Sequence, residues 1–181
     1  MLNDQDGLYT LFMKGVKKGQ EIQDIELISN IVKGVDPYAN FNDYLSIARE
    51  ESLEFMISNT TEAGIAYVAS DTQDMQPPTS FPAKLTVLLH ERFKHFNGDS
   101  SKGLTIIPCE LINHNSETLK EIILKYISDW NLGDDFKTWI LESNSFHSTL
   151  VDRIVPGYPK DEIEAYNAQL DYSDNLIVAA E

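Results

Sequence analysis

The chain has 181 residues, of which 42% are hydrophobic, so it is long enough to bury a core and does not have the composition of a disordered protein. Its 29 acidic and 14 basic side chains give a formal net charge of −15, which repels phosphate backbones and anionic membrane surfaces. The charge balance therefore argues against nucleic acid and membranes as partners.

The cysteine content and the first residues limit the compartment. Cys109 is the single cysteine, so an internal disulfide framework is excluded, and no Cys/His spacing typical of a metal site occurs. The sequence starts with an acidic stretch that lacks the apolar core of a secretory signal, and no apolar run approaches the ~20 residues that span a bilayer. We therefore expect a cytoplasmic protein without a bound metal.

The first part of the chain predicts a strand pair and a short helix. Residues 8–13 form an apolar, strand-like run, and a turn at residues 17–19 leads into a second run at residues 22–32. Asn40 is placed to cap a short helix. A short apolar strand is expected next, at residues 55–58.

The central part alternates helices with strands. Ser80 is the expected cap of a helix at residues 81–96, whose apolar side chains fall on one face. A buried-type strand at residues 104–107 and an amphipathic helix at residues 119–130 follow. This alternation requires right-handed crossovers, which give a parallel sheet. We therefore predict an α/β fold, a partial Rossmann-type doubly wound sheet with flanking helices.

The last part predicts helices at residues 134–142 and 161–170 and a final apolar strand at residues 176–179. Because strands lie close to both ends, we expect residues 1–181 to be a single, incomplete domain with further chain on both sides. A sheet without its first strand exposes unpaired backbone, so we also expect self-association through that edge.

Polar side chains follow the two central strands, where open α/β sheets build their ligand sites. Asn59, Thr60 and Glu62 come after the strand at residues 55–58, and Glu110 comes after the next strand. No Gly-x-Gly-x-x-Gly occurs in the sequence, so the turn that cradles phosphates in such sheets is absent from these residues. The sequence therefore predicts part of a site.

Four segments in this order resemble the nucleotide-binding domain of the mannitol dehydrogenase family, and in particular its uronate-reducing members: residues 58–64, 80–85, 107–111 and 150–159. Together they are far more specific than any one of them. The resemblance covers nearly the whole chain. It implies a two-domain, metal-free dehydrogenase that uses NAD to reduce a keto-uronate to an aldonate, with a sugar acid as its substrate.

The resemblance assigns cofactor contacts to the segment after the first of these strands. Ser58, Asn59, Thr60 and Glu62 are the residues that it places against the ribose hydroxyls and the carboxamide of the nicotinamide nucleotide. The alternative is a helix cap, because Thr60 and Thr61 ahead of Glu62 suit that role as well.

The resemblance also assigns catalytic groups. Glu110 matches the acid of a Cys-Asp-Asn stretch in polyol-reducing relatives, but Leu111 stands where they have the amide that stabilises the developing alkoxide. Asn113 or Asn115 is then left to polarise the carbonyl, and we list Asn115 as the candidate. The alternative for Asn115 is the N-cap of a helix that starts at Ser116.

Asp152 and Arg153 form the strongest polar pair of the sequence. Asp152 is expected to orient a catalytic group or the nicotinamide amide, and Arg153 to bind the substrate carboxylate bidentately. The alternative is a structural ion pair that anchors the proline-rich turn at residues 156–159.

Family members begin with a glycine-rich strand and turn and finish with a helical domain that carries a Lys, an Asn and a His for proton transfer. Neither part is in this sequence, so we expect the chain to supply only part of the cofactor domain and to be inactive alone. A fructuronate or hexitol dehydrogenase is the related alternative. A non-catalytic acidic module that binds a protein through its sheet edge is the alternative of another class.

Overall fold

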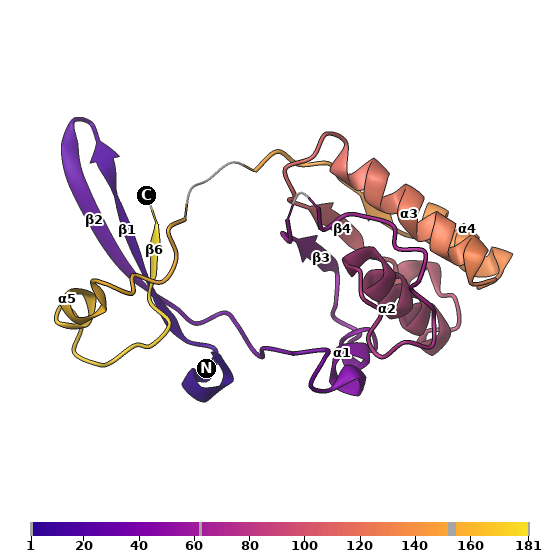
Figure 1. Ribbon diagram of the computed structural model, residues 1–181, viewed down its shortest axis with the longest axis horizontal. Coiled ribbons are helices and arrows are strands. Elements are labelled where there is room, and N and C mark those ends of the chain that lie inside the picture. The colour runs from indigo at the N-terminus through magenta and orange to yellow at the C-terminus, as the bar shows by residue number, and fades with distance from the viewer. Residues whose placement is uncertain (1, 62, 152–154, 181) are drawn as a thin grey trace. The chain divides into compact units, whose positions relative to one another are not determined.

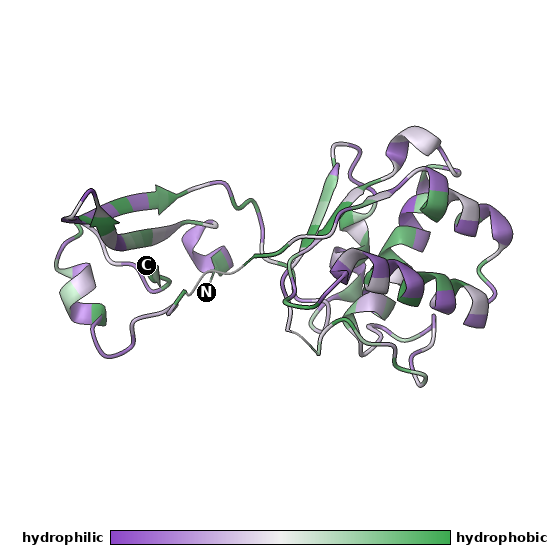
Figure 2. Cartoon of the chain, turned by 90° about the horizontal axis from the view of Figure 1, so that it is seen from above, coloured by the Kyte–Doolittle hydropathy of each residue, from purple (hydrophilic) through white to green (hydrophobic). Residues whose placement is uncertain are grey.

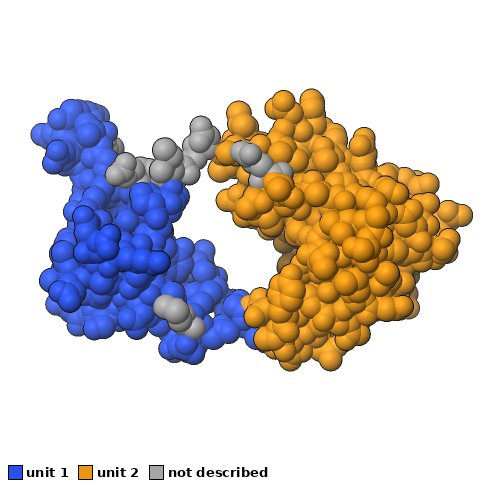
Figure 3. Space-filling view, viewed as in Figure 1, with its two compact units in different colours: residues 1–34, 152–181 blue, residues 35–151 orange. Residues whose placement is uncertain are grey.

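The computed structural model describes residues 2–61, 63–151 and 155–180, which form two compact units (Figures 1 and 3). Unit 1 contains Met1–Gly34 and Asp152–Glu181, and unit 2 contains Val35–Val151. Each unit has a three-stranded sheet and a hydrophobic core of its own. That residues 1–181 form a single, incomplete cofactor domain stays a prediction.

Unit 1 is built on a hairpin. The strands β1 (Tyr9–Lys17) and β2 (Gln20–Ile28) pair antiparallel, and β6 (Val178–Ala180) runs parallel to β1, which gives the order β2-β1-β6. Figure 2 shows hydrophobic and polar residues mixed along both hairpin strands. The buried residues of the hairpin, Thr10 and Phe12, belong to β1, whereas β2 is exposed along nearly its whole length. Phe12 is buried against Tyr166, with 4.8 Å between ring centroids. The strand pair expected from the sequence is confirmed.

Unit 2 contains the parallel sheet. Its strands β3 (Phe55–Ser58), β4 (Thr105–Pro108) and β5 (Ser145–Phe146) are all parallel in the order β3-β4-β5. This confirms the Rossmann-type prediction, although β5 was not foreseen because two residues carry no readable alternation. The helical elements of the unit are α1 (Phe41–Ile47), α2 (Phe81–His95), η2 (Ser100–Lys102), α3 (Asn115–Asp129) and α4 (Asp134–Glu142).

The core of unit 2 lies between the helices and one face of the sheet. Ile106 of β4 is fully buried among Leu85 and Leu89 of α2 and Leu119 and Ile123 of α3. Helix α2 begins as expected, because the Ser80 hydroxyl accepts a hydrogen bond from the Ala83 amide at 3.3 Å. The apolar stripes read from the sequence therefore face this core.

The opposite face of the sheet is open over β3. Side chains alternate along a strand, so Phe55 and Ile57 point away from the core to which Met56 and Ile106 belong. Phe55 is 56% exposed and Ile57 is 67% exposed. Strand β3 is also an edge of its sheet.

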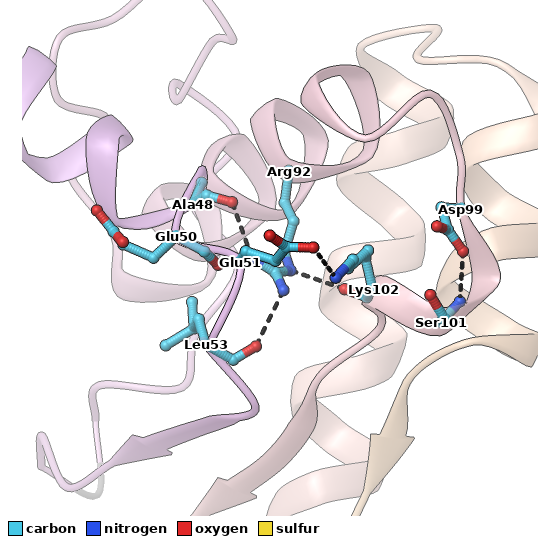
Figure 4. A network of polar contacts seen from close by, with 8 residues as sticks. All are labelled: Ala48, Glu50, Glu51, Leu53, Arg92, Asp99, Ser101 and Lys102. Atoms are coloured by element: carbon cyan, nitrogen blue, oxygen red, sulfur yellow. Dashed lines mark hydrogen bonds and ion pairs between the residues drawn. The ribbon is translucent and has the colours of Figure 1, made fainter.

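A buried arginine joins α2 to the chain around it (Figure 4). The Arg92 guanidinium donates hydrogen bonds to the carbonyls of Ala48, Glu50 and Leu53, each at 2.9 Å, and to that of Lys102 at 2.7 Å. Arg92 is 1% exposed, and this burial lowers the pKa of its guanidinium. The cation is thus balanced by backbone dipoles that belong to the segments before β3 and β4.

Two elements at the end of the chain differ from the sequence-based prediction: the helix is shorter, and the last strand begins and ends later. The helix predicted at residues 161–170 is α5 (Ile163–Asn167), because the Asn167 side chain bonds to backbone groups at Ile163 and Asp174 and competes with helix continuation. The last strand lies at Val178–Ala180.

No helix among the described residues is long and apolar enough to cross a membrane.

Candidate functional site

A pocket of about 500 Å³ lies beyond the carboxyl ends of β3 and β4 in unit 2. The last residues of the two strands, Ser58 and Pro108, are register partners, so the segments that follow them leave the sheet side by side. The Cys109 amide donates to the Ser58 carbonyl at 2.7 Å and extends the pairing by one bond. Among the described residues, Asn59, Thr60, Thr61, Ala63, Glu110 and Leu111 line the pocket.

Glu110 joins the two strand ends. Its Oε2 accepts a hydrogen bond from the Ser58 hydroxyl at 3.0 Å, and its Oε1 accepts from the Thr60 amide at 3.1 Å and from the Thr60 hydroxyl at 2.9 Å. Glu110 is 3% exposed and Ser58 is 5% exposed. A buried carboxylate is tolerated here because three donors replace its water.

Gly64 closes the turn that Thr60 begins. Its amide donates to the Thr61 carbonyl at 2.8 Å. A Cβ added at Gly64 would lie 1.9 Å from the Thr60 hydroxyl oxygen and 2.7 Å from the Thr60 Cβ. Sequence reasoning gave Gly64 no role, and the only available signal was a glycine soon after a polar strand end.

Asn115 lies at the first turn of α3 and is fully buried. Its Nδ2 lies 3.0 Å from the Pro108 carbonyl oxygen and 3.1 Å from those of Glu110 and Thr149, while its Oδ1 accepts from the Thr149 amide at 3.3 Å. Asn115 is thus not the N-cap weighed in the sequence, since His114 holds that position with φ 53°. The Asn115 amide instead ties the loop after β4 to the segment after β5.

A second set of bonds anchors the segment after β5 to α3. The Ser148 hydroxyl donates to a Glu117 carboxylate oxygen at 2.6 Å and lies 2.8 Å from the Ser116 hydroxyl. Hydrogen bonds from Ser148, from the backbone and from Ser116 lower the pKa of Glu117. The Thr149 hydroxyl donates to the Pro108 carbonyl at 2.7 Å. Ser148 and Thr149 are therefore anchored to the start of α3 and to the end of β4.

The candidate residues divide into two groups. Asn59, Thr60 and Glu110 line the pocket, and the buried Ser58 bonds to Glu110, as expected from strand ends that share a rim. Asn115 lies next to them through its bond to the Glu110 carbonyl. The remaining three candidates lie outside the described residues: Glu62, Asp152 and Arg153.

A carboxyl with a strongly lowered pKa, that of Asp71, lies away from this pocket, next to the start of α2 and to Tyr126 of α3. Burial raises the pKa of Asp71, but hydrogen bonds from Ser80 and Thr79 outweigh it and bring the value to about 2. The Tyr126 hydroxyl also bonds to this carboxylate at 3.4 Å. Asp71 is 3% exposed, so this network supports helix packing.

Leu111 gives the pocket an apolar side chain that is 49% exposed. Glu110 is the one charged residue among the lining residues described, and the Asn59, Thr60 and Thr61 side chains add neutral donors and acceptors. No group of three or more His, Cys, Asp or Glu side chains that could hold a metal ion occurs among the described residues. The pocket thus offers hydrogen bonds and a small apolar surface to a neutral, polar group.

Residues 1–181 match the mannitol dehydrogenase Rossmann domain family. The chain is 48% identical over 181 residues to an altronate oxidoreductase of Yersinia enterocolitica and 47% identical over 180 residues to one of Bacillus subtilis. Each alignment covers 99% of this chain and 38% of the relative. The chain therefore spans well under half the length of these curated relatives.

Solved structures show the same fold. A mannitol 2-dehydrogenase of Pseudomonas fluorescens in a ternary complex with NAD and D-mannitol matches with a TM-score of 0.76 at 16% identity, over 99% of this chain and 37% of that one. A substrate-free D-sorbitol dehydrogenase matches with a TM-score of 0.78 at 19% identity, over 99% of this chain and 38% of that one. At these identities the likeness concerns the fold alone.

Proposed function

Because this chain belongs to the mannitol dehydrogenase family, we propose that it forms part of the nucleotide-binding domain of an NAD-dependent oxidoreductase that acts on a sugar acid. The substrate pair that we propose is tagaturonate and altronate. The observation that carries this proposal is the 48% identity, over 99% of the chain, to a protein named altronate oxidoreductase. The pocket at the carboxyl ends of two parallel strands supports it, because ligands bind there in open α/β sheets.

The chemistry of the pocket fits the nicotinamide side of the cofactor better than its pyrophosphate. Ribose hydroxyls and a carboxamide need neutral donors and acceptors, which the exposed side chains of Asn59, Thr60 and Thr61 supply. A pyrophosphate needs cationic groups or a glycine-rich helix start, and the described lining residues contain neither. We therefore place the nicotinamide riboside at this pocket and the pyrophosphate outside it.

The bound nicotinamide supplies or accepts a hydride at the carbon that changes between ketone and alcohol. In this proposal Asn59 and Thr60 orient the ring, and Leu111 limits the access of water to it. Asn115 fixes the loop after β4, which carries Glu110 and Leu111. The proton that balances the hydride comes from a group outside this sequence.

Asp152 and Arg153 keep their proposed roles toward the reacting centre and the substrate carboxylate. A uronate presents a carboxylate that a guanidinium binds with two parallel hydrogen bonds. Glu62 keeps its proposed place among the cofactor contacts. These three assignments follow from their positions in the sequence, since they lie outside the described residues.

We also propose a cytoplasmic location and self-association through the edge of β3. The support for association is the exposure of Phe55 and Ile57 on an edge strand, where unpaired backbone and apolar surface meet. Sedimentation of the purified chain over a range of concentrations tests it, and a monomer throughout would rule it out.

The proposed function is tested on the protein expressed from its complete gene. NADH consumption is measured with tagaturonate, fructuronate and fructose, and the reverse reaction with altronate and NAD. We expect the highest kcat/KM with tagaturonate. A clear preference for fructuronate or fructose would overturn the substrate assignment, and a protein that binds no NADH would overturn the proposal as a whole.

The cofactor contact is tested by Asn59→Ala, which should raise the KM for NADH about 10-fold through the loss of one or two hydrogen bonds. Asn42→Ala is the matched control, because Asn42 is an exposed residue of α1. Equal KM values in the two variants would remove Asn59 from the site.

A further inference from the structure

Glu110 could serve the pocket in two chemically different ways, because an acid at the rim of a sheet can transfer a proton or can hold a loop. The geometry points to the second: we infer that Glu110 and Gly64 are positioning residues that together fix Thr60 in the wall of the nicotinamide pocket. The inference rests on the proposed function, since it concerns how that same pocket binds the nucleotide.

The carboxylate of Glu110 is occupied by the chain. An ionised carboxylate has about four acceptor positions, and three of them are filled by the Ser58 hydroxyl and the Thr60 amide and hydroxyl, at 2.9–3.1 Å. Glu110 is 3% exposed. A general acid or base must reach the proton that it moves. Here Oε2 faces Ser58 at the end of β3, and Oε1 faces Thr60 in the turn that follows it.

Gly64 constrains the same threonine from another direction. A Cβ at Gly64 would lie 1.9 Å from the Thr60 hydroxyl oxygen and 2.7 Å from the Thr60 Cβ. Any residue larger than glycine at position 64 would therefore displace Thr60. A threonine cannot swing clear at small cost, since branching at Cβ restricts its χ1 angle. Thr60 is thus held by two hydrogen bonds to Glu110, from its amide and from its hydroxyl, in a position that is open because Gly64 has no side chain.

This arrangement separates binding from chemistry. Asn59, Thr60 and Thr61 form the pocket wall, so a shift of Thr60 moves the donors that face the nicotinamide riboside. Releasing Thr60 should therefore weaken NADH binding. Hydride transfer in the fraction that has bound NADH should change little, because Glu110 moves no proton.

The test compares variants of the complete protein by the Kd for NADH, by kcat at saturating NADH and by the pH profile of kcat. Glu110→Gln retains an oxygen that accepts from Thr60, and the Ser58 hydroxyl can turn to accept from its amide, so Kd and kcat should change by less than about 3-fold. Glu110→Ala and Gly64→Ala should each raise the Kd about 10-fold or more, with kcat within about 3-fold.

Matched controls are available on the same chain. Glu121→Gln makes the same exchange at an exposed position of α3, and Gly15→Ala adds a methyl group where the structure has open space within 4 Å. Both should leave the Kd unchanged. Should Glu110→Ala fail to fold, Thr60→Val deletes one of the three donors and should raise the Kd in the same direction.

A second readout does not depend on the cofactor. Amide hydrogen exchange at residues 59–61 should accelerate in Glu110→Ala and Gly64→Ala and not in the controls, because the Thr60 amide is itself a donor to Glu110. If Glu110→Gln lowers kcat about 100-fold or more and removes a step from the pH profile, Glu110 transfers a proton and the inference is wrong.

Unchanged exchange and NADH affinity in Gly64→Ala would overturn the role of Gly64. If the wild-type protein binds no NADH, the proposed function is refuted. If amide exchange at residues 59–61 is nevertheless faster in Glu110→Ala and Gly64→Ala than in the wild type, the positioning of Thr60 remains supported.

Discussion

Replacing Arg92 with methionine should destabilise unit 2 more than any other single loss of charge among the residues discussed above. Methionine has a similar length and no donors, so Arg92→Met preserves much of the packing and removes the hydrogen bonds. Arg92 is 1% exposed, and its guanidinium lies within 2.9 Å of four backbone carbonyl oxygens (Figure 4). Those carbonyls come from the segment before β3 and from the turn before β4.

The magnitude follows from the number of bonds and from the cost of burying the charge. A hydrogen bond to a charged group contributes about 1.5–3 kcal/mol, so four independent bonds would give an unrealistic total. The desolvation of the guanidinium in the wild-type protein offsets part of this gain, and water reaches some of the freed carbonyls. We therefore expect Arg92→Met to lower the free energy of unfolding by about 3–5 kcal/mol, as when one partner of a buried ionic contact is removed.

Urea unfolding followed by tryptophan fluorescence measures this loss in the 181-residue chain. Trp130 and Trp139 are its two tryptophans, and both lie in unit 2. Arg49→Met is the matched control, because the Arg49 side chain is 48% exposed and its ion pair with Glu91, at 2.8 Å, should contribute about 0–1 kcal/mol. A cost below about 1 kcal/mol for Arg92→Met, or one equal to the control, would refute the reasoning.

Two further predictions concern unit 2. The pKa of Asp71 is about 2 in the folded protein and about 3.9 in an unfolded chain. Because folding lowers this pKa, the ionised Asp71 carboxylate stabilises the fold above pH ~4. This stabilisation is lost as the pH falls toward ~2. Thermal melts between these pH values should show a smaller decline of Tm in Asp71→Asn, and an unchanged decline would contradict the assignment. Ile57→Thr should reduce the binding of a hydrophobic dye without lowering the free energy of unfolding, because Ile57 is 67% exposed on β3; undiminished dye fluorescence would show that the accessible apolar surface lies elsewhere.

The sequence was sufficient to predict the elements whose apolar pattern is long or whose ends carry strong signals. Helix α2 is an example, since Ser80 caps it and its apolar stripe of leucine and phenylalanine side chains extends from Phe81 to Phe93. The parallel order of β3 and β4 followed from the helix between them. Strand β5 could not be read from two residues, because its pairing is determined by β4, about forty residues away.

The division into two units was not readable for a related reason. The apolar strand at the end of the chain was recognised, but nothing in its residues states that it pairs with β1 instead of the parallel sheet. Arg92 was missed as well, because its partners are backbone carbonyls, which leave no mark in the side-chain pattern. Contacts through the backbone and between distant segments are thus what the sequence leaves undetermined.

At the pocket, the sequence predicted which polar residues lie near one another, and the structure shows which of them are buried and which are exposed. The alternation of strands and helices along the chain is enough to predict that polar side chains gather beyond Ser58 and Pro108, because the two parallel strands end at one rim. It cannot predict which of those side chains bond to each other, and Ser58, Glu110 and Asn115 are buried and bonded within the chain. In the proposed function, the ligand meets the exposed residues of the turn after β3, while the buried set determines the conformation of that turn. Substitutions in the buried set should consequently alter affinity through the shape of the turn, which is why the amide-exchange measurement at residues 59–61 can distinguish the two groups.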